Sequence, residues 1–131
     1  TPAFDTFPLV EAAIDYLQAT GLERIHRHSR SWLTMARDEL ERAGFSIFTP
    51  SGNDAPAMAF WVGEAQSAVD AKFRAAGVRI GFASGSRINE TYGANELCCR
   101  VRISPAHYND GDDLQRFLAI ASQLARYEPQ P

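Results

Sequence analysis

The chain has 131 residues and a mass of 14.5 kDa, the size of one ordinary domain, with 45% hydrophobic and 22% charged residues. Its formal net charge of −3 argues against a nucleic-acid-binding surface, and no apolar run approaches the roughly 18 residues that a membrane span requires. These features predict a cytoplasmic protein that binds neither nucleic acid nor a membrane.

Two helices are expected over the first third of the chain. Apolar residues recur with helical spacing in residues 7–20 and again in residues 22–43, and Gly21 and Gly44 stand where each helix would end. Charged residues occupy the opposite face of the second segment. The pattern predicts a helix pair with a bend between its two members.

Strands and helices alternate over the rest of the chain. Short β-favouring runs bounded by Pro or Gly predict four strands, at residues 45–49, 57–62, 78–82 and 98–104. Helical spacing predicts a helix over residues 64–76 and a last helix that Asn109 and Asp110 are suited to cap. The order α-α-β-β-α-β-β-α predicts a single α/β domain over residues 1–131, a two-layer sandwich with helices on one face of about four strands.

The polar segment of residues 84–97 joins two of the predicted strands. A loop of this length inside a compact domain is usually functional or mobile. The sequence from Gly81 to Arg87 looks like a phosphate-binding loop, but it lacks the Gly-Lys-Ser/Thr ending and opens no helix. Two interpretations stay open: an ordinary surface loop, or a flexible loop that offers Ser84, Ser86 and Arg87 as hydrogen-bond donors to a substrate.

Two arginines in the predicted strand of residues 98–104 are candidate anion-binding residues. Arg100 and Arg102 alternate with apolar neighbours, so both side chains lie on the same face of the strand. Guanidinium groups on an otherwise apolar strand need anionic partners. These partners are either internal carboxylates or the carboxylate of a ligand, which arginine binds through two parallel hydrogen bonds.

The histidines do not predict a metal site. His26 and His28 are two residues apart on a predicted helix, so their side chains diverge and cannot share an ion, and both are read as solvated residues. His28 is also spaced to stack on Trp32. His107 and Tyr108 follow the last strand and are read as structural, with Tyr108 packed on the core.

No catalytic residue is expected within the chain. Cys98 and Cys99 are adjacent, which excludes a disulfide framework or zinc pattern, and they are read as small hydrophobic side chains. Lys72 is the single lysine, and it falls on a predicted helix as a solvated residue. No nucleophile, base and acid form a set that would predict a hydrolase.

The segment from Arg100 to Asn109 (RVRISPAHYN), followed by an acidic helix start, resembles the C-terminal small domain of the class V aminotransferase-like family. These are pyridoxal-phosphate enzymes that include cysteine desulfurases and isopenicillin N epimerase-like proteins. Residues 9–25 are similar to the helix pair of this domain, and residues 77–81 to the strand before its active-site loop. The resemblance covers essentially the whole chain.

The resemblance implies roles for particular residues. Arg102 matches the arginine that holds the α-carboxylate of an amino-acid substrate, and Ser84 and Arg87 of the loop are the other expected substrate-binding residues. Thr1 matches a threonine that contacts the cofactor phosphate of the neighbouring subunit in family homodimers. Ser84 falls where the desulfurases place a catalytic cysteine, which speaks against cysteine desulfurase chemistry because a serine hydroxyl is not an ionised sulfur nucleophile.

The lysine that holds the cofactor lies, in this family, on a large domain that these residues do not resemble. The chain is therefore expected to be an excised part of a larger pyridoxal-phosphate enzyme, inactive and without cofactor by itself. The alternatives are a stand-alone module that binds a small carboxylate or a protein without catalysis, and a purely structural or dimerising domain. The sequence leaves open which amino acid is the substrate, and whether the reaction is transamination, epimerisation or β-elimination.

Overall fold

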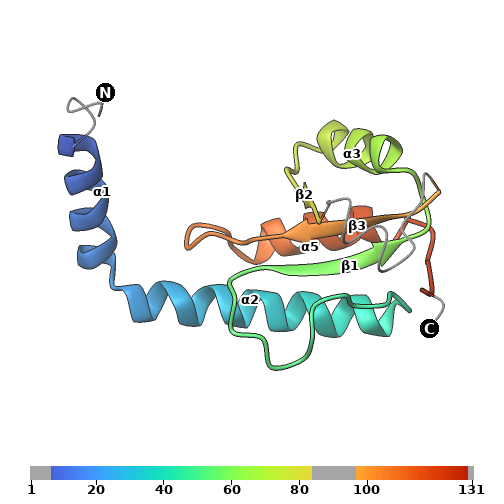
Figure 1. The fold of residues 1–131 in the computed structure, drawn as a ribbon, viewed down its shortest axis with the longest axis horizontal. Helices are drawn as coiled ribbons and strands as arrows, with labels where there is room; N and C mark the ends of the chain where they lie inside the picture. Colours follow the sequence, from blue (N-terminus) through green and yellow to red (C-terminus); the bar gives the residue numbers. More distant parts are fainter. Residues whose placement is uncertain (1–6, 84–96, 130–131) are drawn as a thin grey trace.

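The computed structural model describes residues 7–83 and 97–129 (Figure 1). Thr1, Ser84, Ser86 and Arg87, four of the predicted site residues, lie outside these ranges. The elements in chain order are α1 (Phe7–Thr20), α2 (Leu22–Arg42), β1 (Met58–Val62), α3 (Gln66–Ala75), β2 (Gly81–Phe82), β3 (Cys99–Ile103) and α5 (Gly111–Ala121). In the part of the chain that the structure describes, no helix combines the length and the apolar character needed to cross a membrane.

The three strands form one antiparallel sheet in the order β1-β3-β2, with β3 in the centre (Figure 1). Phe60 of β1 is paired with Val101 of β3, and Gly81 of β2 is paired with Arg102. Alternate residues of β1 and β3 enter a core that they share with α2, α3 and α5. The predicted two-layer α/β sandwich, with helices on one face of the sheet, is confirmed.

The core is apolar and rich in aromatic rings. Phe117 of α5 stacks on Phe73 of α3 with ring centroids 5.6 Å apart, and it meets Phe60 edge to face at 6.1 Å. These contacts join both helices to the sheet. The buried side chains are Trp32, Leu33, Ala36, Leu40, Phe45, Met58, Phe60, Val62, Val69, Phe73, Cys99, Val101, Ile103, Leu114, Phe117, Ile120, Ala121 and Leu124.

The predicted strand at residues 45–49 is only partly formed. Ile47 makes a single antiparallel bridge to Phe60. Beyond it, the side-chain hydroxyl of Thr49 accepts the N–H of Ala59 at 2.8 Å, and the Ala59 carbonyl accepts the N–H groups of both Phe48 and Thr49. A side chain therefore replaces a backbone acceptor of a regular ladder, and three named strands form where about four were predicted.

The predicted strand at residues 78–82 is also shorter than expected. β2 contains only Gly81 and Phe82, although Val78 and Ile80 still pack against the core. Continuing the register would place Arg79 opposite Ser104 and Val78 opposite Pro105, which has no N–H to donate to a ladder. The chain diverges from β3 at this point.

The helix α1 projects away from the rest of the molecule (Figure 1). Gly21 separates it from α2 with φ of 91°, a left-handed conformation that favours glycine, and the predicted bend is confirmed. None of its side chains is buried. Its exposed large hydrophobic residues are Phe7, Leu9, Val10, Ile14, Tyr16 and Leu17.

The predicted cap of the last helix is confirmed at Asp110. One of its carboxylate oxygens accepts the N–H groups of Asp112 and Asp113 at 2.9 and 3.0 Å. The Asp113 carboxylate in turn accepts the N–H of Asp110 at 3.3 Å, which completes a capping box. The start of α5 is thereby fixed directly after the segment that follows β3.

Candidate functional site

The two arginines of β3 share a face of the sheet, as predicted, but have different environments. Both alternate with Cys99, Val101 and Ile103, which enter the core. Arg100 is only 2% exposed, and its guanidinium carbon lies 5.1 Å from the ring centroid of Phe48 and 5.0 Å from that of Trp61. Arg102 is exposed. Burial between aromatic rings gives Arg100 a structural role, whereas Arg102 can reach a ligand.

The backbone of β2 leaves room for the side chain of Arg102. A Cβ atom built on Gly81 would lie 3.2 Å from both Nε and Nη2 of Arg102. This is closer than most real Cβ contacts, so a side chain at position 81 would displace the guanidinium. Gly81 therefore allows the head group of Arg102 to lie directly against the strand.

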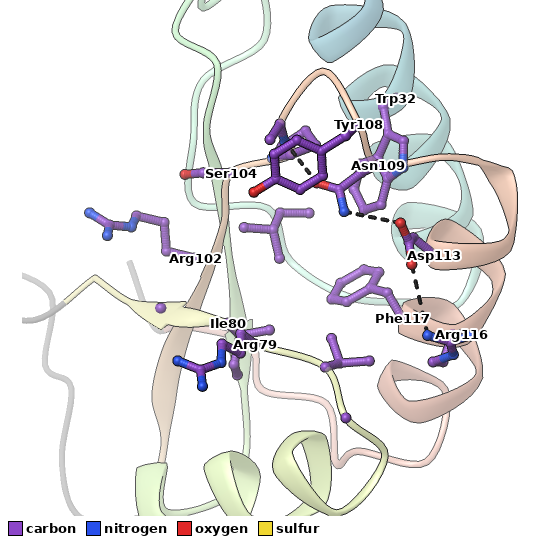
Figure 2. A pocket seen from close by; sticks show the side chains of 16 residues that line it. Trp32, Arg79, Ile80, Arg102, Ser104, Tyr108, Asn109, Asp113, Arg116 and Phe117 are labelled. Atoms are coloured by element: carbon purple, nitrogen blue, oxygen red, sulfur yellow. Dashed lines mark hydrogen bonds and ion pairs between the residues drawn. The ribbon is translucent and has the colours of Figure 1, made fainter. Parts of the chain in front are cut away.

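A cavity of about 540 Å³ opens where the chain diverges from β3 (Figure 2). Its charged lining consists of three arginines, Arg79, Arg102 and Arg116, and one aspartate, Asp113. Arg116 lies 3.8 Å from Asp113, while no ion pair joins Arg79 or Arg102 to a carboxylate within the described ranges. The cavity thus has an excess of positive charge and suits an anionic ligand.

The segment that follows β3 forms one wall of the cavity and is held by hydrogen bonds from α2. Trp32 donates its indole N–H to the Asp110 carbonyl at 3.1 Å, and Ser29 donates its hydroxyl to the Pro105 carbonyl at 3.3 Å. His28 Nε2 lies 2.7 Å from the Asn109 carbonyl. Three residues from two adjacent turns of α2 therefore fix this wall.

Asn109 holds the same segment from within. Its side-chain oxygen accepts the N–H of Ala106 at 2.8 Å, and its amide donates to the Asp113 carboxylate at 3.0 Å (Figure 2). Hydrogen bonds from the Asn109 amide and then the Asp110 N–H lower the pKa of Asp113 below its ordinary value. Asp113 is therefore anionic at neutral pH and keeps the wall attached to α5.

The structure corrects two interpretations of aromatic residues near this wall. Tyr108 does not pack on the core: it is 75% exposed and lines the cavity. His28 is not simply solvated, because it contacts the Asn109 carbonyl, and it makes no ring stack with Trp32 among the described contacts. His107 is structural, as predicted, since its Nε2 lies 2.8 Å from the hydroxyl of Tyr16.

The cysteines have the structural role that was predicted. Both are buried and neither forms a disulfide. Burial raises the pKa of the Cys99 thiol to about 12, and the neighbouring Cys98 and Glu64 shift it in the same direction. A thiol with this pKa is not a nucleophile at neutral pH.

Lys72, the single lysine of the sequence, lies away from the cavity. It belongs to α3 and makes an ion pair with Glu64 at 2.6 Å. The described ranges also hold no cluster of three potential metal ligands. The arrangement of arginines around the cavity can therefore bind and orient an anion.

Arg79 is the site residue that the sequence reasoning missed. It precedes Gly81 by two positions in a predicted strand, so the same alternation that placed Arg100 and Arg102 together assigns Arg79 to the face of Gly81. The signal was present, but it required knowing that this strand lies beside β3.

The fold and the cavity define a small α/β domain with three arginines in the lining of its cavity. The sequence model of the family Aminotransferase class-V matches residues 1–117, and the chain belongs to this family, as the resemblance of its Arg100–Asn109 segment implied. A probable cysteine desulfurase of Xylella fastidiosa (strain 9a5c) is 27% identical over 131 residues, which cover 96% of this chain and 30% of that protein.

A solved structure shows the same fold. The apo structure of a cysteine desulfurase from Thermococcus onnurineus NA1 matches with a TM-score of 0.76 at 21% sequence identity, covering 86% of this chain and 28% of that chain. The chain thus spans about 30% of the length of the relatives that it matches.

Proposed function

We propose that this chain is the C-terminal, substrate-closing domain of a pyridoxal-phosphate-dependent class V enzyme that acts on an amino acid. The observation that carries the proposal is Arg102, which is exposed at the edge of a cationic cavity while its neighbour Arg100 is buried. In this role Arg102 binds the substrate α-carboxylate through two parallel hydrogen bonds. Pyridoxal phosphate supplies, when bound, an electron sink for chemistry at the α-carbon.

The remainder of the active site belongs, in this proposal, to a large domain and a second subunit. The exposed apolar residues of α1 and the 30% coverage of the desulfurase relative support a larger protein that covers this helix. By the family resemblance, the proposal assigns Thr1 to the cofactor phosphate of a partner subunit in a homodimer and Ser84 and Arg87 to the substrate; these three residues lie outside the described ranges. The isolated chain is inactive, and the parent enzyme is cytoplasmic.

Ser84 separates the proposed reaction from that of the cysteine desulfurases. The buried Cys98 and Cys99 do not replace the missing nucleophile, because the raised pKa keeps the Cys99 thiol protonated and Cys98 is only 4% exposed. The proposed chemistry is therefore transamination, epimerisation or β-elimination of an amino acid rather than removal of sulfur by a cysteine of this chain.

The test is steady-state kinetics of the full-length protein that carries this chain. Arg102→Ala loses a hydrogen-bonded contact to the substrate carboxylate. Its Michaelis constant for the amino acid should therefore be about 10- to 150-fold higher than that of the wild-type protein. Arg102→Lys should recover part of the loss, since an ammonium cannot reproduce the planar fork. Arg24→Ala is the matched control, because Arg24 is exposed on α2 and absent from the cavity lining.

Two results would contradict the proposal. Substrate kinetics of Arg102→Ala that equal those of Arg24→Ala would remove the carboxylate-binding role. Stoichiometric attachment of pyridoxal phosphate to Lys72 of the isolated chain, trapped with borohydride and mapped by mass spectrometry, would show that the large domain is not needed to hold the cofactor. The ion pair of Lys72 with Glu64 argues that this attachment does not occur.

A further inference from the structure

We infer that the substrate carries a second anionic group, and that Arg79 binds this group while Arg102 binds the α-carboxylate. The inference rests on the proposed function and names the class of its substrate: amino acids with an acidic side chain. It starts from the position of Arg79 in the cavity lining beside Arg102.

Arg79 and Arg102 lie on the same face of the sheet. Val78, Ile80 and Phe82 pack against the core, so the alternation of the chain turns Arg79 and Gly81 to the opposite face. Gly81 is paired with Arg102, whose neighbours Val101 and Ile103 also enter the core. Figure 2 shows the side chains of Arg79 and Arg102 projecting to the same side of the two adjacent segments.

The two guanidinium groups can reach one small ligand. Arg79 lies two positions before Gly81, which is paired with Arg102, and both arginines line the same cavity, so their long side chains can approach one ligand. Gly81 lies between them and has no side chain to fill the space. A ligand with two anionic groups can therefore contact both arginines at once.

The charges around the pair favour a dianion over a monoanion. Among the residues that the structure describes, no carboxylate makes an ion pair with Arg79 or Arg102. Both line the cavity, where Asp113 already faces Arg116. A ligand with a single carboxylate would neutralise Arg102 and leave the positive charge of Arg79 beside it.

The test is equilibrium binding to the full-length protein, measured by isothermal titration calorimetry with two probes of equal carbon number. Glutarate carries two carboxylates and pentanoate carries one. The variants are Arg79→Gln and Arg102→Gln, with Arg24→Gln as the matched control on the exposed face of α2. Arg79 is itself exposed, so its replacement leaves the core intact, and thermal unfolding of each variant checks this.

We expect the wild-type protein and Arg24→Gln to bind glutarate roughly tenfold more tightly than pentanoate. Arg79→Gln should reduce this preference to near unity and leave pentanoate binding within about twofold. Arg102→Gln should weaken both probes.

Two outcomes would overturn the inference and leave the proposed function standing: an unchanged preference in Arg79→Gln, or an equal loss of both probes, which would mean that the two arginines share one carboxylate. Pentanoate binding that does not depend on Arg102 would instead overturn the α-carboxylate role, and with it the inference.

Discussion

Arg100→Ala should lower the stability of the protein, whereas Arg102→Ala should weaken ligand binding, although both arginines lie on the same face of one strand. Arg100 is 2% exposed and lies between Phe48 and Trp61, with its guanidinium carbon about 5 Å from each ring centroid. Arg102 is exposed, and Gly81 lies directly beneath it. The substitution, the strand and the face are the same, so the difference in environment is isolated.

The structure sets the size of the two effects. A desolvated cation–π contact contributes up to about 2 kcal/mol, and Arg100 makes two such contacts in a buried position. Arg100→Ala should therefore lower the free energy of unfolding by about 2–4 kcal/mol. Arg102→Ala removes an exposed side chain and should change it by less than about 0.5 kcal/mol.

The assay is urea unfolding followed by tryptophan fluorescence, because Trp61 touches Arg100 and reports the loss of that contact. Glutarate binding, measured in parallel, should be weakened by Arg102→Ala. Equal losses of stability in the two variants would refute the reasoning, since it depends on burial of one arginine and exposure of the other. A fully stable Arg100→Ala would do the same.

Two further predictions concern titratable groups. Burial raises the pKa of the Cys99 thiol to about 12, so this thiol should resist alkylation by iodoacetamide at pH 8 in the folded chain and react in urea. Mass spectrometry measures the labelling, and equal rates in the folded and unfolded states would contradict the prediction. Hydrogen bonds depress the pKa of Asp113 in the folded state, so its contribution to stability is present above the unfolded pKa of about 3.9 and is lost as the pH falls below it. Asp113→Asn should therefore be less stable than the wild type in urea at pH 7, with the difference closing below about pH 4; a difference that does not change with pH would contradict it.

The sequence predicted the features that depend on neighbours along the chain. Helix periods, the bend at Gly21 and the cap at Asp110 are local properties, and the structure has all of them. The placement of Arg100 and Arg102 on one face follows from the two-residue period of a strand and needs no knowledge of the partner strands. Family membership also followed from the sequence, through the segment from Arg100 to Asn109.

The strand lengths were decided by contacts between segments. The run at residues 45–49 favours a strand, yet the Thr49 hydroxyl takes the N–H of Ala59 and limits the pairing to one bridge at Ile47. Tyr108 was expected to pack on the core, but α2 holds the backbone of residues 105–110 by hydrogen bonds and leaves the tyrosine ring exposed. In both cases a polar contact with a distant residue prevailed over local preference.

The different roles of the two β3 arginines were likewise decided only by the tertiary structure. The same alternation describes both, but Phe48 and Trp61 come from other segments and enclose Arg100 alone. Arg79 reaches the site because the adjoining strand β2 pairs with β3, a pairing that brings together residues about twenty positions apart in the sequence. By itself the sequence determined which side chains share a face of the strand. The tertiary structure determined that Arg100 is buried among aromatic rings and that Arg102 is exposed, because burial depends on atoms that the rest of the chain supplies.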